Sequence, residues 1–153
     1  MGETEAFDDI TMMAIKFNAM QNENSITTYP DVNSVGIVSK FINNRAEHFE
    51  LQPKIKNKLQ IAVDEIYSNI MRYSTAKTAT VFCEKQEDTV TLTFIDNGVE
   101  YDPTCAKDPD VTLSAEDREI GGLGIFMVKK TAESMAYKRE DNKNKLTIVY
   151  KIL

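Results

Sequence analysis

The sequence has few of the residues on which metal, redox and histidine chemistry depend. It contains two cysteines and a single histidine in 153 residues. Cys83 and Cys105 lie far apart and lack the spacing of a zinc site, and Cys83 falls in a strand-like run that favours a small buried side chain. His48 lies near the end of a predicted helix without partners for a catalytic triad. We therefore interpret His48 as a surface residue.

Long hydrophobic runs and an excess of basic residues are also missing. No apolar run approaches the about 18–20 residues that cross a bilayer. The first residues, MGETEAFDDI, lack the basic and apolar regions of a signal peptide. The expected protein is soluble and cytoplasmic, with no membrane partner. The net charge of −6 argues against direct binding of nucleic acid, although a locally positive pocket could still hold a nucleotide.

The chain length predicts one domain, which we place over residues 24–153. Residues 1–23 show no clean hydrophobic period. They could form an extra strand, a segment that faces a partner, or a poorly ordered arm.

Hydrophobic spacing predicts a short strand at 25–29 and then two helices. The first helix has an apolar face of Val35, Val38, Ile42 and Phe49, with Asp31, Asn33 or Ser34 as its cap. The second begins near Pro53, and its apolar face comprises Ile55, Leu59, Ala62, Val63, Ile66 and Ile70. Residues 78–84 and 89–96 alternate in hydrophobicity, which predicts a β-hairpin.

The last third of the chain begins with a long, acidic loop at 99–120, a length typical of functional or mobile segments. A third helix should follow, with an apolar face of Ile125, Val128, Ala132 and Met135. The closing NKLTIVYKIL predicts a strand. This order of elements indicates an α+β fold, a two-layer sandwich of a mostly antiparallel sheet with helices on one face.

Two polar residues of the second helix are candidates for chemistry. Glu65 and Asn69 are four residues apart and share a face beside the apolar stripe. A carboxylate there could act as a general base, and an amide oxygen suits Mg²⁺. The alternative is a solvated glutamate beside an ordinary helical asparagine.

A third candidate lies at the end of the second hairpin strand. Asp96 has the same parity as Val90, Leu92 and Phe94, so its side chain should face the core. An inward carboxylate is costly unless it is paired, and Gly98 follows where backbone can approach another group closely. The alternative is an ordinary turn that Asp96 caps itself.

Three glycines, Gly121, Gly122 and Gly124, precede the third helix in the phrase EIGGLGIFMVKK. A helix that starts after such a loop offers free N–H groups to an anion. The phrase is neither a Walker A loop nor a dinucleotide fingerprint. The alternative is a tightly packed helix start with no ligand.

Taken in order, these three motifs resemble the GHKL (histidine kinase-like) ATPase superfamily, over about residues 24–153. The small size and the phrase DREIGGLGIFMVKKTAESMAYKRED are most similar to the small anti-sigma-factor serine kinases (RsbW type). One position departs from that pattern, because Tyr73 stands where small family members often carry a histidine. The resemblance implies the Bergerat ATP-binding fold, with a mostly antiparallel mixed sheet, and the cofactors ATP and Mg²⁺.

The resemblance also assigns roles to single residues. Asp96 would accept a hydrogen bond from the adenine amino group, and Gly98 would let the base lie against the backbone. Asn69 would hold Mg²⁺ that bridges the phosphates. Glu65 would be the general base that takes the proton from an acceptor hydroxyl. Thr147 would lie near the adenine on the last strand.

The loop at 99–120 would be the ATP lid. Its hinge and phosphate contact would be Gly121, Gly122, Leu123 and Gly124. Arg118 would meet the γ-phosphate, since the guanidinium group matches phosphate oxygens in shape.

By resemblance, the function would be an ATP- and Mg²⁺-dependent serine/threonine protein kinase that acts on a STAS-domain anti-sigma factor antagonist. Phosphorylation would break that complex by adding charge to an interface. The freed kinase would hold a sigma factor inactive, and relatives are often homodimers. Two alternatives stay open: an ATP-gated protein-binding module with little or no kinase activity, in which lid order alone switches the partner, and a non-catalytic interaction domain.

Overall fold

The computed structural model of the chain describes residues 19–110, 112–114, 116 and 122–153. Within that part of the chain the elements follow the order strand, strand, helix, helix, hairpin, helix, hairpin. The strands are β1 (Ala19–Gln21), β2 (Ser25–Thr28), β3 (Ala79–Gln86), β4 (Thr89–Asp96), β5 (Ser134–Glu140) and β6 (Lys143–Lys151). The helices are α2 (Ser34–His48), α3 (Pro53–Tyr73), α4 (Leu123–Thr131) and the short 3₁₀ helix η1 (Pro103–Cys105).

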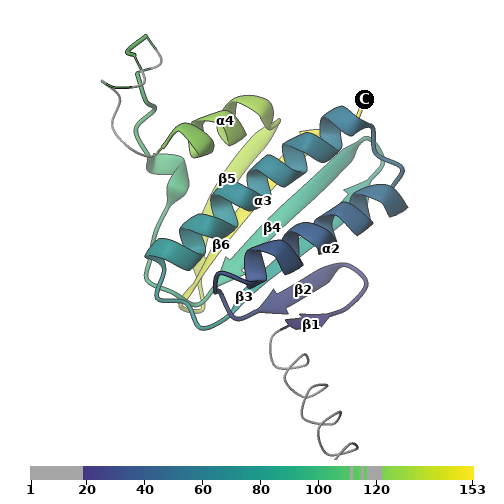
Figure 1. Cartoon of the computed structure of the whole chain (residues 1–153), viewed down its shortest axis with the longest axis horizontal. Helices are drawn as coiled ribbons and strands as arrows, with labels where there is room; N and C mark the ends of the chain where they lie inside the picture. Colours follow the sequence, from purple (N-terminus) through teal and green to yellow (C-terminus); the bar gives the residue numbers. More distant parts are fainter. Residues whose placement is uncertain (1–18, 111, 115, 117–121) are drawn as a thin grey trace, which may run out of the picture.

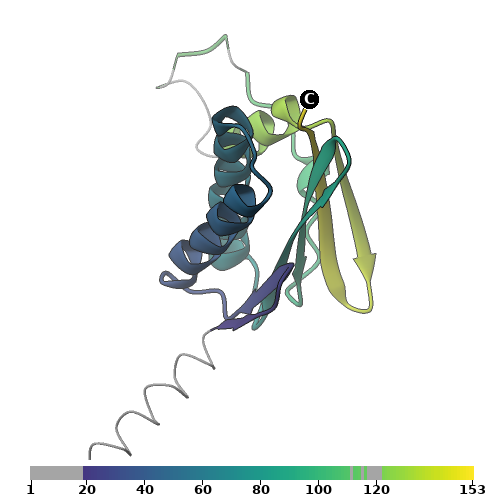
Figure 2. The same ribbon diagram turned by 90° about the vertical axis from the view of Figure 1, so that its right-hand side faces the viewer.

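The described strands form one sheet in the order β1-β2-β3-β4-β6-β5, and each pair of neighbours is antiparallel. Helices α2, α3 and α4 all lie on the same face of this sheet (Figure 1). Seen from the side, helices and sheet make two layers (Figure 2). The predicted α+β two-layer sandwich is confirmed.

The core lies between the two layers, where the apolar stripes of the helices meet the inward residues of the strands. Alternation explains the sheet side of this core, since every second residue of β4 and β6 is buried. On the helix side, α3 buries seven residues along its length, among them Leu59, Val63 and Tyr67. None of the described helices is long and apolar enough to span a membrane.

Both predicted helix starts are found, with local differences. Pro53 occupies the first turn of α3, where its missing N–H costs nothing. At α2 the capping position is Asn33, but the capping carboxylate is that of Asp31, which accepts hydrogen bonds from the N–H groups of Asn33 and Ser34. Residues 19–21 form strand β1. They belong to the segment 1–23, for which the sequence left three alternatives.

The third helix is shorter than the sequence predicted, and a strand that was not predicted follows it. Helix α4 ends at Thr131, so Ala132 and Met135 do not continue its stripe. Residues 134–140 form β5 instead, paired with β6 through a turn in which Asp141 and Asn142 both have positive φ. Aspartate and asparagine tolerate that conformation, which is the one that a two-residue hairpin turn requires.

Candidate functional site

A cavity of about 130 Å³ opens between the C-terminal half of α3 and the sheet. Its apolar wall includes Ile66, Ile70, Phe94 and Leu146, and residues 99–103 close it on one side. Its polar side chains include Asn69, Asp96 and Asn144. A mostly apolar pocket with a few converging polar groups is typical of a small-molecule site.

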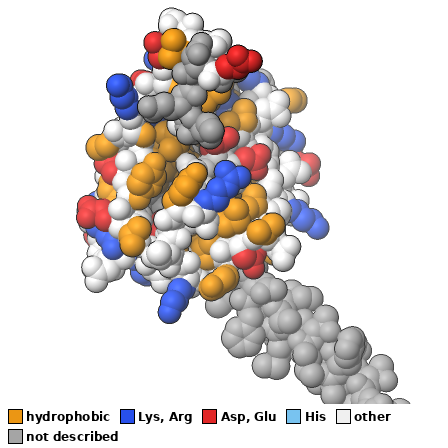
Figure 3. All heavy atoms as spheres, turned by 60° about the vertical axis from the view of Figure 1, so that its left-hand side comes forward, with side chains coloured by type: hydrophobic (Ala, Val, Ile, Leu, Met, Phe, Trp, Pro, Cys, Tyr) orange, Lys and Arg blue, Asp and Glu red, His pale blue; other side chains and the backbone are white. Residues whose placement is uncertain are grey.

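Figure 3 turns the side of the molecule that carries α4 toward the viewer, and hydrophobic side chains gather on this face. Three large hydrophobic residues that line the cavity, Tyr73, Val99 and Tyr101, are exposed to solvent. They give the mouth of the cavity an apolar rim.

Asp96 is the buried carboxylate of the cavity, with 5% of its surface exposed. It ends β4 with the inward parity that the sequence predicted. Its Oδ1 accepts hydrogen bonds from Ser74 Oγ (3.0 Å), the Gly98 N–H (2.9 Å) and Asn144 Nδ2 (3.1 Å). No described residue donates a hydrogen bond to Oδ2. The carboxylate is therefore fixed through one oxygen, and the other keeps its capacity to accept.

Gly98 is enclosed by this same network. A Cβ at this position would lie 1.8 Å from Ser74 Oγ, 2.9 Å from Asp96 Oδ1 and 3.0 Å from the backbone nitrogen of Ala76. The absence of a side chain is thus what lets Ser74, which follows the last turn of α3, reach Asp96.

Strand register brings a second polar residue to Asp96. Asn144 lies directly opposite Asp96 on β6, and Arg139 lies directly opposite Asn144 on β5. Arg139 Nη1 donates to the Gly98 carbonyl (2.8 Å), and Tyr137 Oη donates to Asn144 Oδ1 (2.6 Å). A polar row therefore crosses three strands on the inner face. Desolvation, and next the nearby charge of Glu100, raise the pKa of Tyr137, so this hydroxyl keeps its proton at neutral pH.

Glu65 and Asn69 lie on one face of α3, and the helix rise puts them about 6 Å apart along its axis. Asn69 lines the cavity. Glu65 lies one turn closer to the helix N-terminus and packs on Gly124, where a Cβ would meet Glu65 Oε2 at 1.8 Å. Neither side chain makes a hydrogen bond to another described residue. The carboxylate of Glu65 and the amide oxygen of Asn69 are thus available to groups from outside the described residues.

Helix α4 begins where the sequence placed the glycines. Gly122 caps the helix with φ at 83°, a left-handed conformation that favours glycine, and its carbonyl accepts from the Phe126 N–H (3.0 Å). The N–H groups of the first turn remain free of helical partners. They lie beside Glu65, because Gly124 belongs to that turn.

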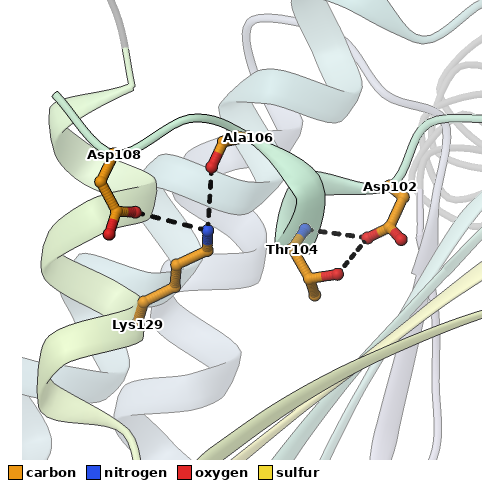
Figure 4. Close-up of polar contacts among 5 residues, drawn as sticks. All are labelled: Asp102, Thr104, Ala106, Asp108 and Lys129. Atoms are coloured by element: carbon orange, nitrogen blue, oxygen red, sulfur yellow. Dashed lines mark hydrogen bonds and ion pairs between the residues drawn. The ribbon is translucent and has the colours of Figure 1, made fainter.

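The first part of the predicted lid contains η1, which is capped at its start and is followed by a contact with α4 (Figure 4). Asp102 Oδ1 accepts from the Thr104 N–H (2.8 Å) and hydroxyl (2.6 Å) at the start of η1. Beyond η1, Lys129 Nζ of α4 donates to the Ala106 carbonyl (3.1 Å) and pairs with Asp108 (3.6 Å). Desolvation would raise the pKa of Asp102, but the hydrogen bonds from Thr104 and Cys105 outweigh it and lower this pKa.

The structure brings several of the sequence-predicted site residues into one region, which contains Glu65, Asn69, Asp96, Gly98, Gly122 and Gly124. Leu123 is in the same first turn of α4 and is 43% exposed. Arg118 and Gly121 lie outside the described residues. Thr147 does not line the cavity: its neighbours Leu146 and Ile148 are the inward residues of β6, which turns Thr147 to the outer face.

Sequence reasoning missed Ser74, Tyr137, Arg139 and Asn144. Asn144 shares the inward parity of Leu146, Ile148 and Tyr150, the same signal that singled out Asp96. Tyr137 and Arg139 could not be placed, because Met135 of their strand was assigned to a helix and residues 136–143 were assigned to no element.

No cluster of three or more histidine, cysteine, aspartate or glutamate side chains that could hold a metal occurs among the described residues. Two asparagines line the cavity, and of these only Asn69 has an amide oxygen that accepts no hydrogen bond from a described residue. A metal ion would fit here only when a ligand supplies most of its oxygens, as a triphosphate does for Mg²⁺.

Comparison with known families gives the class of protein that has this fold and cavity. The model of the histidine kinase-like ATPase domain matches residues 29–150. The chain belongs to this family, as the three motifs indicated, and membership in a family of ATPase domains implies that it binds ATP. Among characterised proteins it is similar to the serine/threonine-protein kinase BtrW of Bordetella bronchiseptica. The two are 30% identical over 112 residues, which cover 67% of this chain and 78% of that protein.

Proposed function

We propose that the chain is an ATP- and Mg²⁺-dependent protein kinase that phosphorylates a serine or threonine of a STAS-domain anti-sigma factor antagonist. One observation carries the proposal: the buried carboxylate of Asp96 and the amide of Asn69 line the same cavity, and Glu65 lies one turn beyond Asn69 on α3, against Gly124 of α4. Similarity to a serine/threonine kinase supports phosphoryl transfer to a protein hydroxyl.

At the cavity end, Asp96 Oδ2 would accept a hydrogen bond from the adenine amino group, while Oδ1 stays bonded to Ser74, Gly98 and Asn144. The apolar wall would cover the faces of the base, and Gly98 keeps the backbone close to it. A base held at this point directs the rest of the nucleotide along α3 toward Asn69.

At the other end, Asn69 would supply an amide oxygen to Mg²⁺, which when bound neutralises charge on the phosphates. The first turn of α4, from Gly122 to Gly124, would place free N–H groups against phosphate oxygens. We also assign Arg118, outside the described residues, to the γ-phosphate.

Glu65 would take the proton of the acceptor hydroxyl as its oxygen attacks the γ-phosphorus. The bond between that phosphorus and the β–γ bridging oxygen breaks, and ADP leaves. Glu65 makes no hydrogen bond to a described residue, so its carboxylate is free to accept this proton. Phosphoryl transfer depends mainly on positioning and charge, which suits a site with so few reactive groups.

Phosphorylation would add charge to the interface with the antagonist and release it. The freed kinase would then bind a sigma factor. We place this chemistry in the cytoplasm, where sigma factors act.

The test is transfer of labelled phosphate from ATP to the STAS-domain proteins of the source genome. Glu65→Gln should lower the transfer rate by about 10²- to 10⁴-fold and leave ATP affinity within about twofold, because only proton removal is lost. The matched control is Asp64→Asn, which removes the same charge from the exposed neighbouring position of α3.

Equal rates for Glu65→Gln and wild type would contradict the role of Glu65. ATP binding without transfer to any of these proteins would contradict the kinase and leave an ATP-gated binding module.

A further inference from the structure

The segment that follows β4 is attached to the sheet through consecutive backbone groups. The Gly98 N–H donates to Asp96 Oδ1 and the Gly98 carbonyl accepts from Arg139. The Val99 carbonyl accepts from Asn144 Nδ2 (2.7 Å), and the Tyr101 N–H donates to Asn144 Oδ1 (3.2 Å). Residues 98–101, here called the stem, are therefore tied by two side chains of the β5–β6 hairpin.

Asn144 carries more of these bonds than any other side chain of the network. It is 6% exposed, and its Oδ1 accepts from the Tyr101 N–H, Tyr137 Oη and Arg139 Nη1. Its Nδ2 donates to Asp96 Oδ1 and the Val99 carbonyl. Both amide hydrogens are used, so Asn144 has no donor left for a ligand.

We propose that Asn144 is a positioning residue that couples recognition of the nucleotide base to the stem of the loop over the cavity. It acts through Asp96: its amide holds Oδ1, which leaves Oδ2 to the base. The same amide holds Val99 and Tyr101, which form a wall of the cavity. The carboxylate that would contact the base and the wall of the cavity are therefore both held by the side chain of Asn144. The inference rests on the proposed use of Asp96, but it does not require that the chain transfers phosphate.

Orientation of the carboxylate matters because of the groups that purines present. Adenine offers an amino donor at the position where guanine offers a carbonyl acceptor. A carboxylate oxygen fixed toward the cavity accepts from the first and repels the second. Loosening Asp96 should therefore reduce the preference for ATP over GTP.

Asn144→Asp is the sharpest variant, because it keeps the shape and the acceptor that faces Tyr101, Tyr137 and Arg139. It removes both donors and places a carboxylate against Asp96. The matched control is Asn142→Asp, the same chemical change in the exposed β5–β6 turn, where aspartate tolerates the positive φ. Tyr137→Phe is a milder second variant, since it removes one hydrogen bond to Asn144 and leaves both amide hydrogens of Asn144 in place.

Calorimetric titration with ATP and with GTP measures the first arm. We expect Asn144→Asp to weaken ATP binding by about tenfold or more and GTP binding by less. The dissociation constant for GTP divided by that for ATP should therefore fall. Tyr137→Phe should change ATP affinity by about two- to threefold in the same direction. Asn142→Asp should match wild type. Circular dichroism melting identifies variants that are not folded.

Hydrogen–deuterium exchange of the ligand-free protein measures the second arm, and it is independent of the proposed function. Peptides that cover residues 98–103 should exchange faster in Asn144→Asp and in Tyr137→Phe, while peptides from α2 stay at wild-type rates. A folded Asn144→Asp variant with the wild-type ATP-to-GTP ratio and unchanged exchange at the stem would overturn the inference. Should wild type fail to bind ATP, the proposed function falls, and the exchange arm alone decides whether Asn144 holds the stem.

Discussion

The two ends of the site along α3 are built in opposite ways. At the end that we propose for the base, here called the base end, Asp96 Oδ1 accepts three hydrogen bonds, and Asn144 and Gly98 are enclosed by their neighbours. At the end that we propose for the phosphates, here called the phosphate end, Glu65 and Asn69 make no hydrogen bond to another described residue. The first end is fixed by the chain before a ligand arrives. The second offers free oxygens and free N–H groups that a ligand must organise.

This difference follows from the chemistry that each end would perform. A base is recognised by one or two hydrogen bonds, and their direction is precise only when the acceptor is held still. A phosphate chain carries several charges and brings a metal with it, so it can order flexible partners on binding. In the proposed function, the fixed carboxylate would recognise the base, and the phosphates and their metal would organise the unbonded groups at the other end.

Among the variants that compare the two ends, the largest effect on ATP affinity should come from the base end. Asp96→Asn replaces one carboxylate oxygen with an amide donor. If that donor faces the base, the amino group of adenine meets another donor; if it faces inward, it meets the groups that donate to Oδ1. We expect ATP affinity to fall by about 30- to 100-fold, the value of a hydrogen bond to a buried charge. Calorimetry measures it. Asp88→Asn, in the exposed β3–β4 turn, is the control. Wild-type affinity in Asp96→Asn would place base recognition elsewhere.

Two glycine substitutions compare the ends directly. In Gly98→Ala the new methyl group would meet a hydrogen-bonded hydroxyl and the backbone at Ala76, so the free energy of unfolding should fall by about 2–3 kcal/mol. In Gly124→Ala it would meet the far end of the flexible Glu65 side chain, which can move away. Stability should then change by less than about 1 kcal/mol, because alanine also favours the helix.

The rate of phosphate transfer and the affinity for ATP should also differ between the two glycine variants. Displacing Glu65 through Gly124→Ala should slow phosphate transfer by about tenfold and leave ATP affinity nearly unchanged. Gly98→Ala should weaken ATP binding itself. Denaturant unfolding and calorimetry measure both variants. A large loss of stability in Gly124→Ala would show that the phosphate end is as rigid as the base end, and the comparison would fail.

The sequence predicted the parts of the site that depend on local spacing. Helical period put Glu65 and Asn69 on one face, and strand parity turned Asp96 inward, without knowledge of their neighbours. The glycine before α4 marked the helix start, which Gly122 caps with positive φ.

What depends on strand register was not predicted. Asn144 reaches Asp96 only because β4 and β6 pair with these two residues opposite each other. The strand β5, with Arg139, was lost because Ala132 and Met135 continue the spacing of the α4 stripe by chance. The Asp141–Asn142 pair was the available signal for a hairpin turn. Thr147 was assigned to the base by resemblance, and the alternation of β6 turns it outward.

The smallest effect should come from the contact between α4 and the segment beyond η1. Lys129→Met removes the ion pair with Asp108 and the hydrogen bond to the Ala106 carbonyl. Asp108 is 57% exposed, so solvent screens the pair, and the loss of stability should stay below about 1 kcal/mol. Exchange of peptides that cover residues 104–110 should nevertheless rise, because Lys129 supplies both a hydrogen bond and an ion pair from α4 to this segment.

Two variants decide which bond matters. Lys130→Met, the exposed neighbour on α4, should leave exchange at 104–110 unchanged. Asp108→Asn removes the charge of the pair but keeps the hydrogen bond to Ala106, so its exchange should lie between wild type and Lys129→Met. If Asp108→Asn matched Lys129→Met, the ion pair alone would hold the segment, and the contact would weaken with salt. If Lys129→Met left exchange unchanged, the segment would be held independently of α4, and the phosphate end would be more rigid than its unpaired side chains suggest.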